Sequence, residues 1–214
     1  MAITENGSST VLETIGDPTN EAESTLLYEL PYTAEVDVVG SSAILFHRWS
    51  VDGVAAKGKA AKGSAAKKTD DVETYVYRDQ DKNICVPSEY LRQSLINAAR
   101  YVQDPRSPRK SAMDLFKAGV VTLEELCPLG SKDWDYLDRR RVMVQRSGIT
   151  RTRPAFQPGW RFTARLMVLT PEYIDARLLQ HTLTNAGRLI GIGDFRPTFG
   201  RYQIARFEVL KDTN

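Results

Sequence analysis

The segment DPRSPRKSA places basic side chains beside serine hydroxyls. Arg106, Arg109 and Lys110 lie there next to Ser107 and Ser111. An arginine guanidinium binds phosphate through two parallel hydrogen bonds, and a serine hydroxyl adds a neutral donor. These residue types predict contacts to phosphate groups, and an ordinary solvated basic surface is the alternative.

A second arginine-rich segment, QRSGITRTRPAF, carries Arg146, Arg151 and Arg153. Residues two apart on a strand share a face, so Arg151 and Arg153 would form a stripe about 7 Å long, close to the phosphate spacing of a single strand. The spacing therefore predicts a second set of phosphate contacts. A solvated sheet face is again the alternative.

The segment GIGDFRPTFGRYQ combines backbone freedom, positive charge and aromatic rings. It holds three glycines, two arginines and two phenylalanines, which are Gly191, Gly193, Gly200, Arg196, Arg201, Phe195 and Phe199. Glycine permits a positive φ and the close approach of another backbone. Phenylalanine rings stack on bases in proteins that bind single strands. The segment predicts nucleic-acid contacts, and a core-packed connection with buried phenylalanines is the alternative.

Lysine is concentrated in one further segment, residues 54–68, which contains Val, Ala, Gly, Ser and Lys alone. Its five lysines are Lys57, Lys59, Lys62, Lys67 and Lys68. Without a large side chain to anchor it, this stretch predicts a mobile basic loop over residues 54–70. Such a loop, together with Arg48 before it, would attract a polyanion diffusely and in a salt-dependent way.

Motifs for catalysis or cofactor binding are absent from the sequence. No HExxH, GxSxG, CxxC or GK[ST] pattern occurs, and the two cysteines, Cys85 and Cys127, are too few for a zinc site or a disulfide framework. His47 follows an apolar run, where it could reach a phosphate or act as a general base. The sequence predicts a protein without enzymatic activity, metal or cofactor, although a nuclease stays open.

The net charge of +2 averages two unlike regions of the 214-residue chain. Residues 1–47 hold eight acidic side chains and no Lys or Arg, whereas residues 48–214 hold all 29 basic and 19 of the 27 acidic side chains, a balance of +10. Such asymmetry indicates a polyanionic partner, with chance as the alternative. No apolar run is long enough to span a membrane and no secretory signal is visible, so we expect a cytoplasmic protein.

The length fits a flexible acidic tail, residues 1–25, followed by a single domain, residues 26–214. A helix is expected after Ser88 as its N-cap and another from Pro171, with Thr170 as its N-cap. Runs that alternate between polar and apolar residues, or that are apolar throughout, predict strands over residues 32–38, 41–49, 73–78, 84–87, 139–147, 160–168 and 201–210. The stretch 150–156 is expected to be a further strand or an extended link.

These elements follow one another as strand, helix, strands, helix and strand, which predicts an α+β fold of the ferredoxin-like β-α-β-β-α-β type (RRM-like). The prolines at 105 and 108 forbid continuation of the first helix. The element order leaves room for insertions in this scaffold, one around residues 104–138 in addition to the basic loop.

Two motifs resemble the RAMP superfamily, whose members are repeat-associated subunits of CRISPR effector complexes. The first motif, ICVPSEYLRQSLINAAR, matches a strand followed by a helix, and its matching positions are Val86, Pro87, Leu91, Arg92 and Leu95. The second is the glycine-rich loop, matching at Gly191, Gly193, Gly200 and Arg201. The run VDVVGSSAILFHRW is similar to the first strand of the superfamily.

The resemblance implies a modified ferredoxin-like domain like that of the backbone subunits that coat guide RNA, or of a phage-encoded relative. It implies that the loop 54–70 or the insertion 104–138 contacts nucleic acid, and it adds Arg92 to the candidate residues. RAMP nucleases often act through a histidine, which implies His47 as a candidate, with the carboxylate of Asp52 as another.

The sequence and the resemblance together predict sequence-independent binding of single-stranded RNA or DNA. The partners expected are the strand itself, further copies of the chain in a homo-oligomer or filament, and other subunits of an effector complex. A protein-interaction module that mimics or inhibits a CRISPR complex is one alternative, and a RAMP-type nuclease is another.

Overall fold

The computed structural model describes residues 30–49, 59, 71–144 and 147–210. The predicted acidic tail, most of the basic loop 54–70 and Asp52 lie outside the described residues. Four of the loop lysines and one arginine of the candidate site also lie outside them: Lys57, Lys62, Lys67, Lys68 and Arg146.

A four-stranded antiparallel sheet forms the body of the molecule, in the order β12-β1-β11-β7. Its strands are β1 (Tyr32–Gly40), β7 (Val120–Thr122), β11 (Arg161–Val168) and β12 (Tyr202–Leu210). Polar and apolar residues alternate along β1, and the two kinds lie on opposite faces of the sheet as expected. Val36 and Val38 are fully buried on one face, while Glu35 and Asp37 lie on the other.

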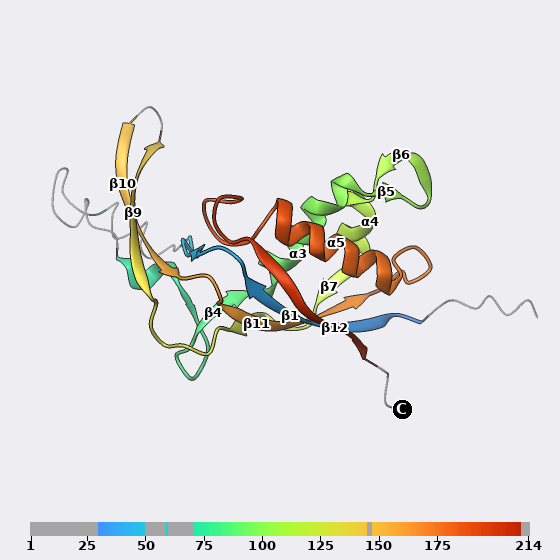
Figure 1. Ribbon diagram of the computed structural model, residues 1–214, viewed down its shortest axis with the longest axis horizontal. Coiled ribbons are helices and arrows are strands. Elements are labelled where there is room, and N and C mark those ends of the chain that lie inside the picture. The colour runs from blue at the N-terminus through green and yellow to red at the C-terminus, as the bar shows by residue number, and fades with distance from the viewer. Residues whose placement is uncertain (1–29, 50–58, 60–70, 145–146, 211–214) are drawn as a thin grey trace, which may run out of the picture.

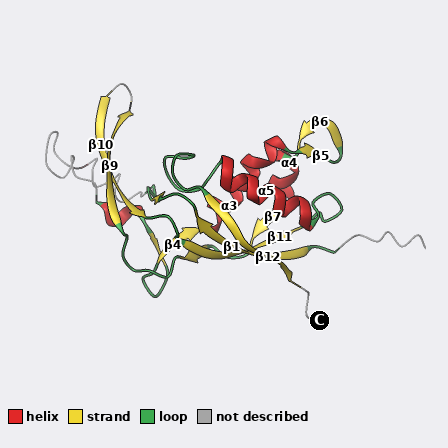
Figure 2. Ribbon diagram, viewed as in Figure 1, coloured by secondary structure: helices red, strands yellow, loops and turns green. Residues whose placement is uncertain are grey.

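Two helices cover the buried face of this sheet, α3 (Ser88–Ala98) and α5 (Ala176–Leu189) (Figure 1, Figure 2). Apolar side chains from both layers meet there, among them Leu95 of α3 and Leu183 of α5, both fully buried. Helix α5 packs closely on β12 because Gly187 has no Cβ, which would lie 2.2 Å from the carbonyl oxygen of Tyr202. The α+β class predicted from the sequence is confirmed.

The sheet strands and covering helices follow the chain order β1, α3, β7, β11, α5, β12, with all other elements inserted between them. Three small sheets make up most of the insertions. The first is β2 (Ile44–Leu45), β10 (Ser147–Phe156) and β9 (Tyr136–Val144); the second is β3 (Tyr77–Arg78), β4 (Ile84–Pro87) and β8 (Leu126–Pro128); the third is β5 (Gln103–Asp104) and β6 (Ser107–Ser111). Helix α4 (Met113–Gly119) and the 3-10 turns η1 (Val72–Tyr75) and η2 (Ala99–Tyr101) complete them.

The two inserted hairpins lie at opposite ends of the molecule (Figure 1). The long β9–β10 hairpin extends away from the body at one end, and the short β5–β6 hairpin lies beyond the helices at the other. The loop between α5 and β12 lies between them, on the side of the sheet that the helices cover.

The predicted start of the last helix at Pro171 is wrong. Tyr173 N and Ile174 N both donate to Thr170 O, which makes a turn, and the helix begins only at Ala176. Its N-cap is Asp175, whose carboxylate accepts a 2.7 Å hydrogen bond from Leu178 N. A carboxylate caps better than the threonine expected there and also favours the helix dipole.

Other local predictions also change. Ser88 lies inside α3 rather than at its N-cap, because its hydroxyl donates to Glu124 O and Pro87 takes the cap position. The proline-containing stretch after this helix forms the β5–β6 hairpin. Residues 115–121 divide between α4 and β7, and the stretch 150–156 is a strand. No helix in the described ranges is long and apolar enough to cross a membrane.

Candidate nucleic-acid interface

The loop between α5 and β12 (residues 190–201, the glycine-rich loop) is fixed by hydrogen bonds to the segment after β1. Gly200 N donates to Ala43 O at 2.7 Å and Asp194 N donates to Leu45 O at 2.9 Å. Within the loop, Ile192 N donates to Gly200 O at 2.9 Å, and the Ile192 side chain is fully buried. The backbone therefore holds the loop's other side chains in defined positions.

Glycine is required at two points of this arrangement. Gly200 has φ +73°, and a Cβ there would lie 1.6 Å from Ile192 O. Gly193 has φ +79°, and its Cβ would lie 2.8 Å from Leu45 O. The positive φ predicted for these glycines from the sequence is confirmed.

Asp194 links the loop to the base of the β9–β10 hairpin. Its carboxylate accepts a hydrogen bond from Arg153 Nε, and its Oδ2 lies 3.5 Å from His47 Nδ1. Partial burial raises the pKa of Asp194, but the hydrogen bonds from His47 and Arg153 outweigh it and hold the pKa well below its usual value. Arg153 is only 5% exposed, and its Nη1 has no hydrogen-bond partner among the described residues, so Asp194 is its counter-ion.

Replacing Asp194 by Asn is expected to lower the free energy of unfolding by about 2 kcal/mol at pH 7, because the buried Arg153 charge loses its counter-ion. Since the pKa of Asp194 is lower in the folded than in the unfolded chain, this stabilisation is complete above about pH 4 and is lost as the pH falls below it. The difference between wild type and D194N in urea unfolding should shrink from pH 4 downward.

The control for this experiment is Asp81→Asn, because Asp81 is exposed in a turn and its carboxylate makes no hydrogen bond or ion pair with the described residues. The free energy of unfolding of D81N should equal that of wild type throughout this pH range. A gap between wild type and D194N that stays constant down to pH 2 would contradict an ionised Asp194 as the source of the stabilisation.

Aromatic rings and a guanidinium stack where the loop meets the hairpin. Phe195 and Phe199 pack edge to face with ring centroids 6.1 Å apart. The Cζ of Arg140, from β9, lies 4.4 Å from the Phe199 ring centroid and 5.8 Å from that of Phe195. The alternative of buried phenylalanines is wrong for Phe195, which is 42% exposed, and Phe199 is half-buried.

A second stack adjoins the loop on the side of β3. The Cζ of Arg48 lies 4.7 Å from the ring centroid of Tyr77, which packs edge to face on Tyr90. Burial and a hydrogen bond with Tyr77 raise the pKa of Tyr90, while the charge of Arg196 opposes the rise, so the loop arginine lies within electrostatic reach. Trp49, next to Arg48, is 74% exposed.

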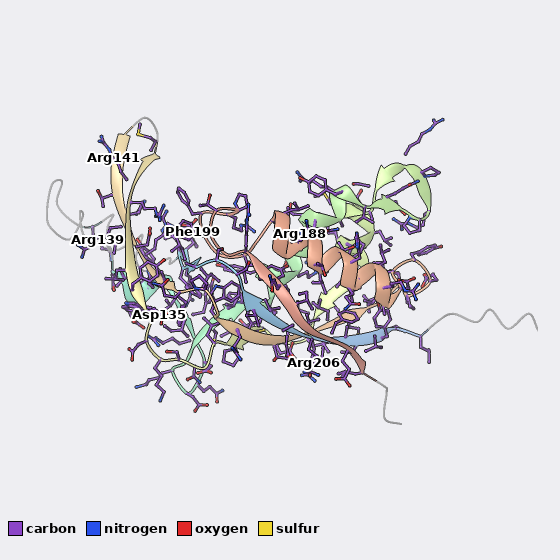
Figure 3. All side chains as sticks on the ribbon, viewed as in Figure 1. Asp135, Arg139, Arg141, Arg188, Phe199 and Arg206 are labelled. Atoms are coloured by element: carbon purple, nitrogen blue, oxygen red, sulfur yellow. The ribbon has the colours of Figure 1, made fainter. Side chains whose placement is uncertain are left out.

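Two adjacent hollows lie where α5 runs into the loop. One is lined by Asn97, Arg100, Leu189, Ile190, Arg196 and Pro197, and the other by Ser41, Arg188, Leu189, Arg201, Tyr202 and Gln203. Figure 3 shows Arg188 on the helix-covered side of the sheet and Phe199 on the neighbouring loop. Neither set of lining residues includes a carboxylate, so both hollows carry a net positive charge.

Three of these arginines, Arg100, Arg188 and Arg196, are exposed and make no ion pair or side-chain hydrogen bond within the described ranges. Arg188 lies in the last turn of α5, where the helix dipole favours a cation. Arg201 donates from Nε to Pro197 O at 2.9 Å and leaves its terminal nitrogens without a partner in this part of the chain. These four residues are called the basic rim below.

The open face of the main sheet has a different character. Arg206 pairs there with Glu35, Asp37 and Glu208, and Arg165 pairs with Glu124. Figure 3 shows Arg206 on the side of the sheet away from Arg188 and Phe199. These two arginines are neutralised by carboxylates, and no aromatic side chain of the described strands faces outward there. The face is therefore poorly suited to a polyanion, in contrast to the sheet surface of an RRM.

The structure brings together five of the predicted site residues, all at or beside the glycine-rich loop: Arg48, Phe195, Arg196, Phe199 and Arg201. Arg109 and Lys110 are exposed but lie on β6, at the far end of the molecule (Figure 1). Lys59 is exposed within a stretch whose neighbours are not described.

The remaining predicted residues have partners within the chain. Arg92 binds the carbonyl oxygens of Val120 and Lys117 and the carboxylate of Glu89. Arg106 pairs with Asp104 and lowers the pKa of that carboxyl to about 2.

The expected stripe of Arg151 and Arg153 does not form on the surface. Arg153 is buried against Asp194, while Arg151 is half-buried and lies directly opposite Arg140 on the ladder of the hairpin. The strand itself is extended as predicted, but the packing of the loop against it covers one of the two side chains.

Arg100, Arg188 and Arg140 were not among the nucleic-acid contacts predicted from the sequence. Arg100 and Arg188 end two different helices, and only the tertiary fold brings them to the same loop. The signal that could have found Arg188 is its place immediately before the glycine-rich loop. Arg140 lies within the run RRR of residues 139–141, where alternation sends the middle arginine to the face opposite its neighbours.

No protein-family model matches the chain, and no curated protein is similar to it in sequence. One solved structure with a similar arrangement is the "Cryo-EM structure of the Type III-B Cmr-beta bound to cognate target RNA", with a TM-score of 0.48 and 8% sequence identity. The match covers 85% of this chain and 61% of that one, so the chain spans about three fifths of the length of that relative. Within the described ranges, no group of three His, Cys, Asp or Glu side chains is placed to hold a metal ion.

Proposed function

We propose that the protein binds single-stranded nucleic acid without regard to sequence, along the glycine-rich loop. The observation that carries this proposal is the convergence at one loop of the basic rim with two arginine–aromatic stacks, on a surface whose hollows have no carboxylate in their lining. Arginines that have no counter-ion among the described residues can bind phosphate, and exposed rings stack on bases of any identity.

The polymer expected is single-stranded, because its bases have free faces for stacking. The described surface presents four guanidinium groups and two exposed or half-buried rings against two amide side chains, Asn97 and Gln203, and this excess favours contacts to the backbone and to base faces. Both kinds of contact are common to RNA and DNA, so both polymers belong in the test.

The fold itself fits this function. The strand order β12-β1-β11-β7, with α3 and α5 on one face, is the order of a β-α-β-β-α-β unit, and we propose that it is the ferredoxin-like domain of a RAMP-type protein. In such a protein the β9–β10 hairpin and the glycine-rich loop would lie along the strand, and several copies would bind one polymer side by side.

The test is a fluorescence-anisotropy titration of the full chain with labelled single-stranded RNA and DNA of about 20 nucleotides, at 50 and 200 mM salt. If the four arginines of the basic rim each neutralise one phosphate, the logarithm of the association constant should fall with that of the salt concentration with a slope of about −3. Binding should then weaken about 50-fold between the two salt concentrations.

A duplex of the same length and the variant Arg161→Gln serve as controls. Arg161 is exposed on the open face of the sheet, so its loss should leave the affinity for single strands unchanged. Absence of binding to both single strands at 50 mM salt would refute the proposal and would favour a module that binds protein instead.

We also propose that binding occurs without cleavage. His47 Nδ1 faces Asp194, but this carboxylate is committed to Arg153, so the contact serves to hold the loop. Labelled RNA and DNA incubated with the protein, with and without magnesium, should remain intact. Cleavage that disappears in His47→Ala would show instead that the protein is a nuclease.

A further inference from the structure

Arg140 differs from the arginines of the basic rim because its charge is already neutralised. Its Nε donates to both carboxylate oxygens of Asp138, at 2.8 and 2.9 Å. Asp138 is only 8% exposed, so the pair is partly shielded from water. A guanidinium in this state is a weak ligand for phosphate, because a phosphate would compete with the carboxylate that already binds it.

The guanidinium of Arg140 is nevertheless held at the surface. One side packs on the ring of Phe199, with Cζ 4.4 Å from the centroid, while 40% of the Arg140 side chain remains exposed. Part of the Arg140 side chain is therefore accessible to a ligand next to the Phe199 ring. A planar guanidinium with one covered and one open face offers a flat surface of about the same kind as an aromatic ring.

Contacts within the hairpin and between the hairpin and the glycine-rich loop fix the position of the Arg140 guanidinium. Asp138 lies directly opposite Arg153 on the hairpin ladder, and Arg153 binds Asp194 of the glycine-rich loop. Phe195, on the same loop, packs edge to face on Phe199 and is 42% exposed. Loop and hairpin thus hold the guanidinium and the exposed ring next to each other without a bound polymer.

We infer that Arg140 is a base-stacking residue, and that its open face, bordered by Phe195, takes one unpaired base of a single strand. This inference rests on the proposed function and adds to it the part of the polymer that is recognised. A base within a duplex has both faces covered by its neighbours, so this contact selects single strands over duplexes. Its contribution is independent of salt, unlike that of the basic rim.

The variant Arg140→Lys tests the inference because it keeps the charge and removes the plane. We expect the affinity for a single-stranded oligonucleotide to fall about tenfold while the slope against salt stays that of wild type, in accordance with the loss of one stacked base. An oligonucleotide carrying 2-aminopurine should show fluorescence quenching with wild type and much less with R140K. The matched control is Arg139→Lys, since Arg139 is exposed on the other face of the same strand and should be indifferent.

A second measurement needs no variant and so does not depend on the folding of R140K. Wild-type protein should bind a single strand with abasic sites about tenfold more weakly than the intact strand, with the same salt slope. Equal binding of the two strands would overturn the inference. A salt slope reduced by about 0.7 in Arg140→Gln, which removes the charge, would instead make Arg140 a phosphate ligand. If wild type binds no strand at all, the proposed function itself fails, which is a different result.

Discussion

Replacing Arg100, Arg188 and Arg196 together by glutamine is expected to weaken the binding of single-stranded RNA or DNA about 100-fold at 0.1 M salt. Each arginine that neutralises a phosphate contributes about 0.7 to the slope against salt, so three contribute about 2. Because counterion release scales with that slope, its loss corresponds to a factor of about 10² at 0.1 M salt. The measurement is the anisotropy titration at several salt concentrations, with the slope as the second readout.

The folded protein should tolerate this triple variant, since none of the three side chains makes an ion pair or side-chain hydrogen bond within the described part of the chain. The control variant loses the same three positive charges elsewhere. It replaces by glutamine Lys117, Arg161 and Arg177, which are exposed away from the glycine-rich loop. Similar losses of affinity in both triple variants would show that binding responds to net charge alone and would contradict a localised interface.

The part of this interface that the sequence predicts is the part encoded locally. Gly193 and Gly200 are visible as glycines that can take a positive φ, and Phe195 and Arg196 lie between them in the same short segment. Local sequence thus identifies the loop, because its conformation depends on residues within about ten positions of each other. The alternation of β1 predicts the central strand for the same reason.

Partners that come from distant parts of the chain were not predictable in this way. Arg153 looks like a surface arginine in its strand, and only the approach of Asp194, 41 residues later, turns it into a buried ion pair. Arg92 lies on a helix where a solvated position is usual, yet it binds carbonyl oxygens of the α4–β7 connection. Both cases show that the sequence states which residues carry charge, while tertiary contacts decide which charges stay available to a ligand.

The same reasoning separates the two faces of the main sheet. Arg206 and Arg188 contribute the same charge to the composition of the chain, but the register of β12 on β1 places Arg206 beside Asp37. Arg188 lies in the last turn of α5, where it lines a hollow that has no carboxylate in its lining. The balance of +10 in residues 48–214 therefore does not indicate where a polyanion binds, because some of the arginines form ion pairs within the chain.

Replacing Gly200 by alanine is expected to lower the free energy of unfolding by about 2–5 kcal/mol, the largest loss of stability that a single methyl group should cause in this loop. A residue with a side chain pays about 1–2 kcal/mol for a φ of +73°. The added Cβ would also lie 1.6 Å from Ile192 O, a backbone atom that cannot rotate away. Relief requires movement of a loop tied to Ala43 and Leu45, and such overpacking costs another 1–3 kcal/mol or more. Urea unfolding followed by tryptophan fluorescence gives the difference.

Gly130→Ala separates the two contributions, because Gly130 has the same φ of +73° and nothing within 4 Å of the position of its Cβ. It should cost only the 1–2 kcal/mol of the backbone conformation and leave nucleic-acid binding unchanged. G200A should also lower the affinity for single strands, since the displaced loop carries Arg196 and both stacked phenylalanines. If G200A and G130A lose the same stability, the loop yields to the methyl group at little cost. The rigid placement of Phe195 beside Arg140, on which base stacking depends, would then be wrong.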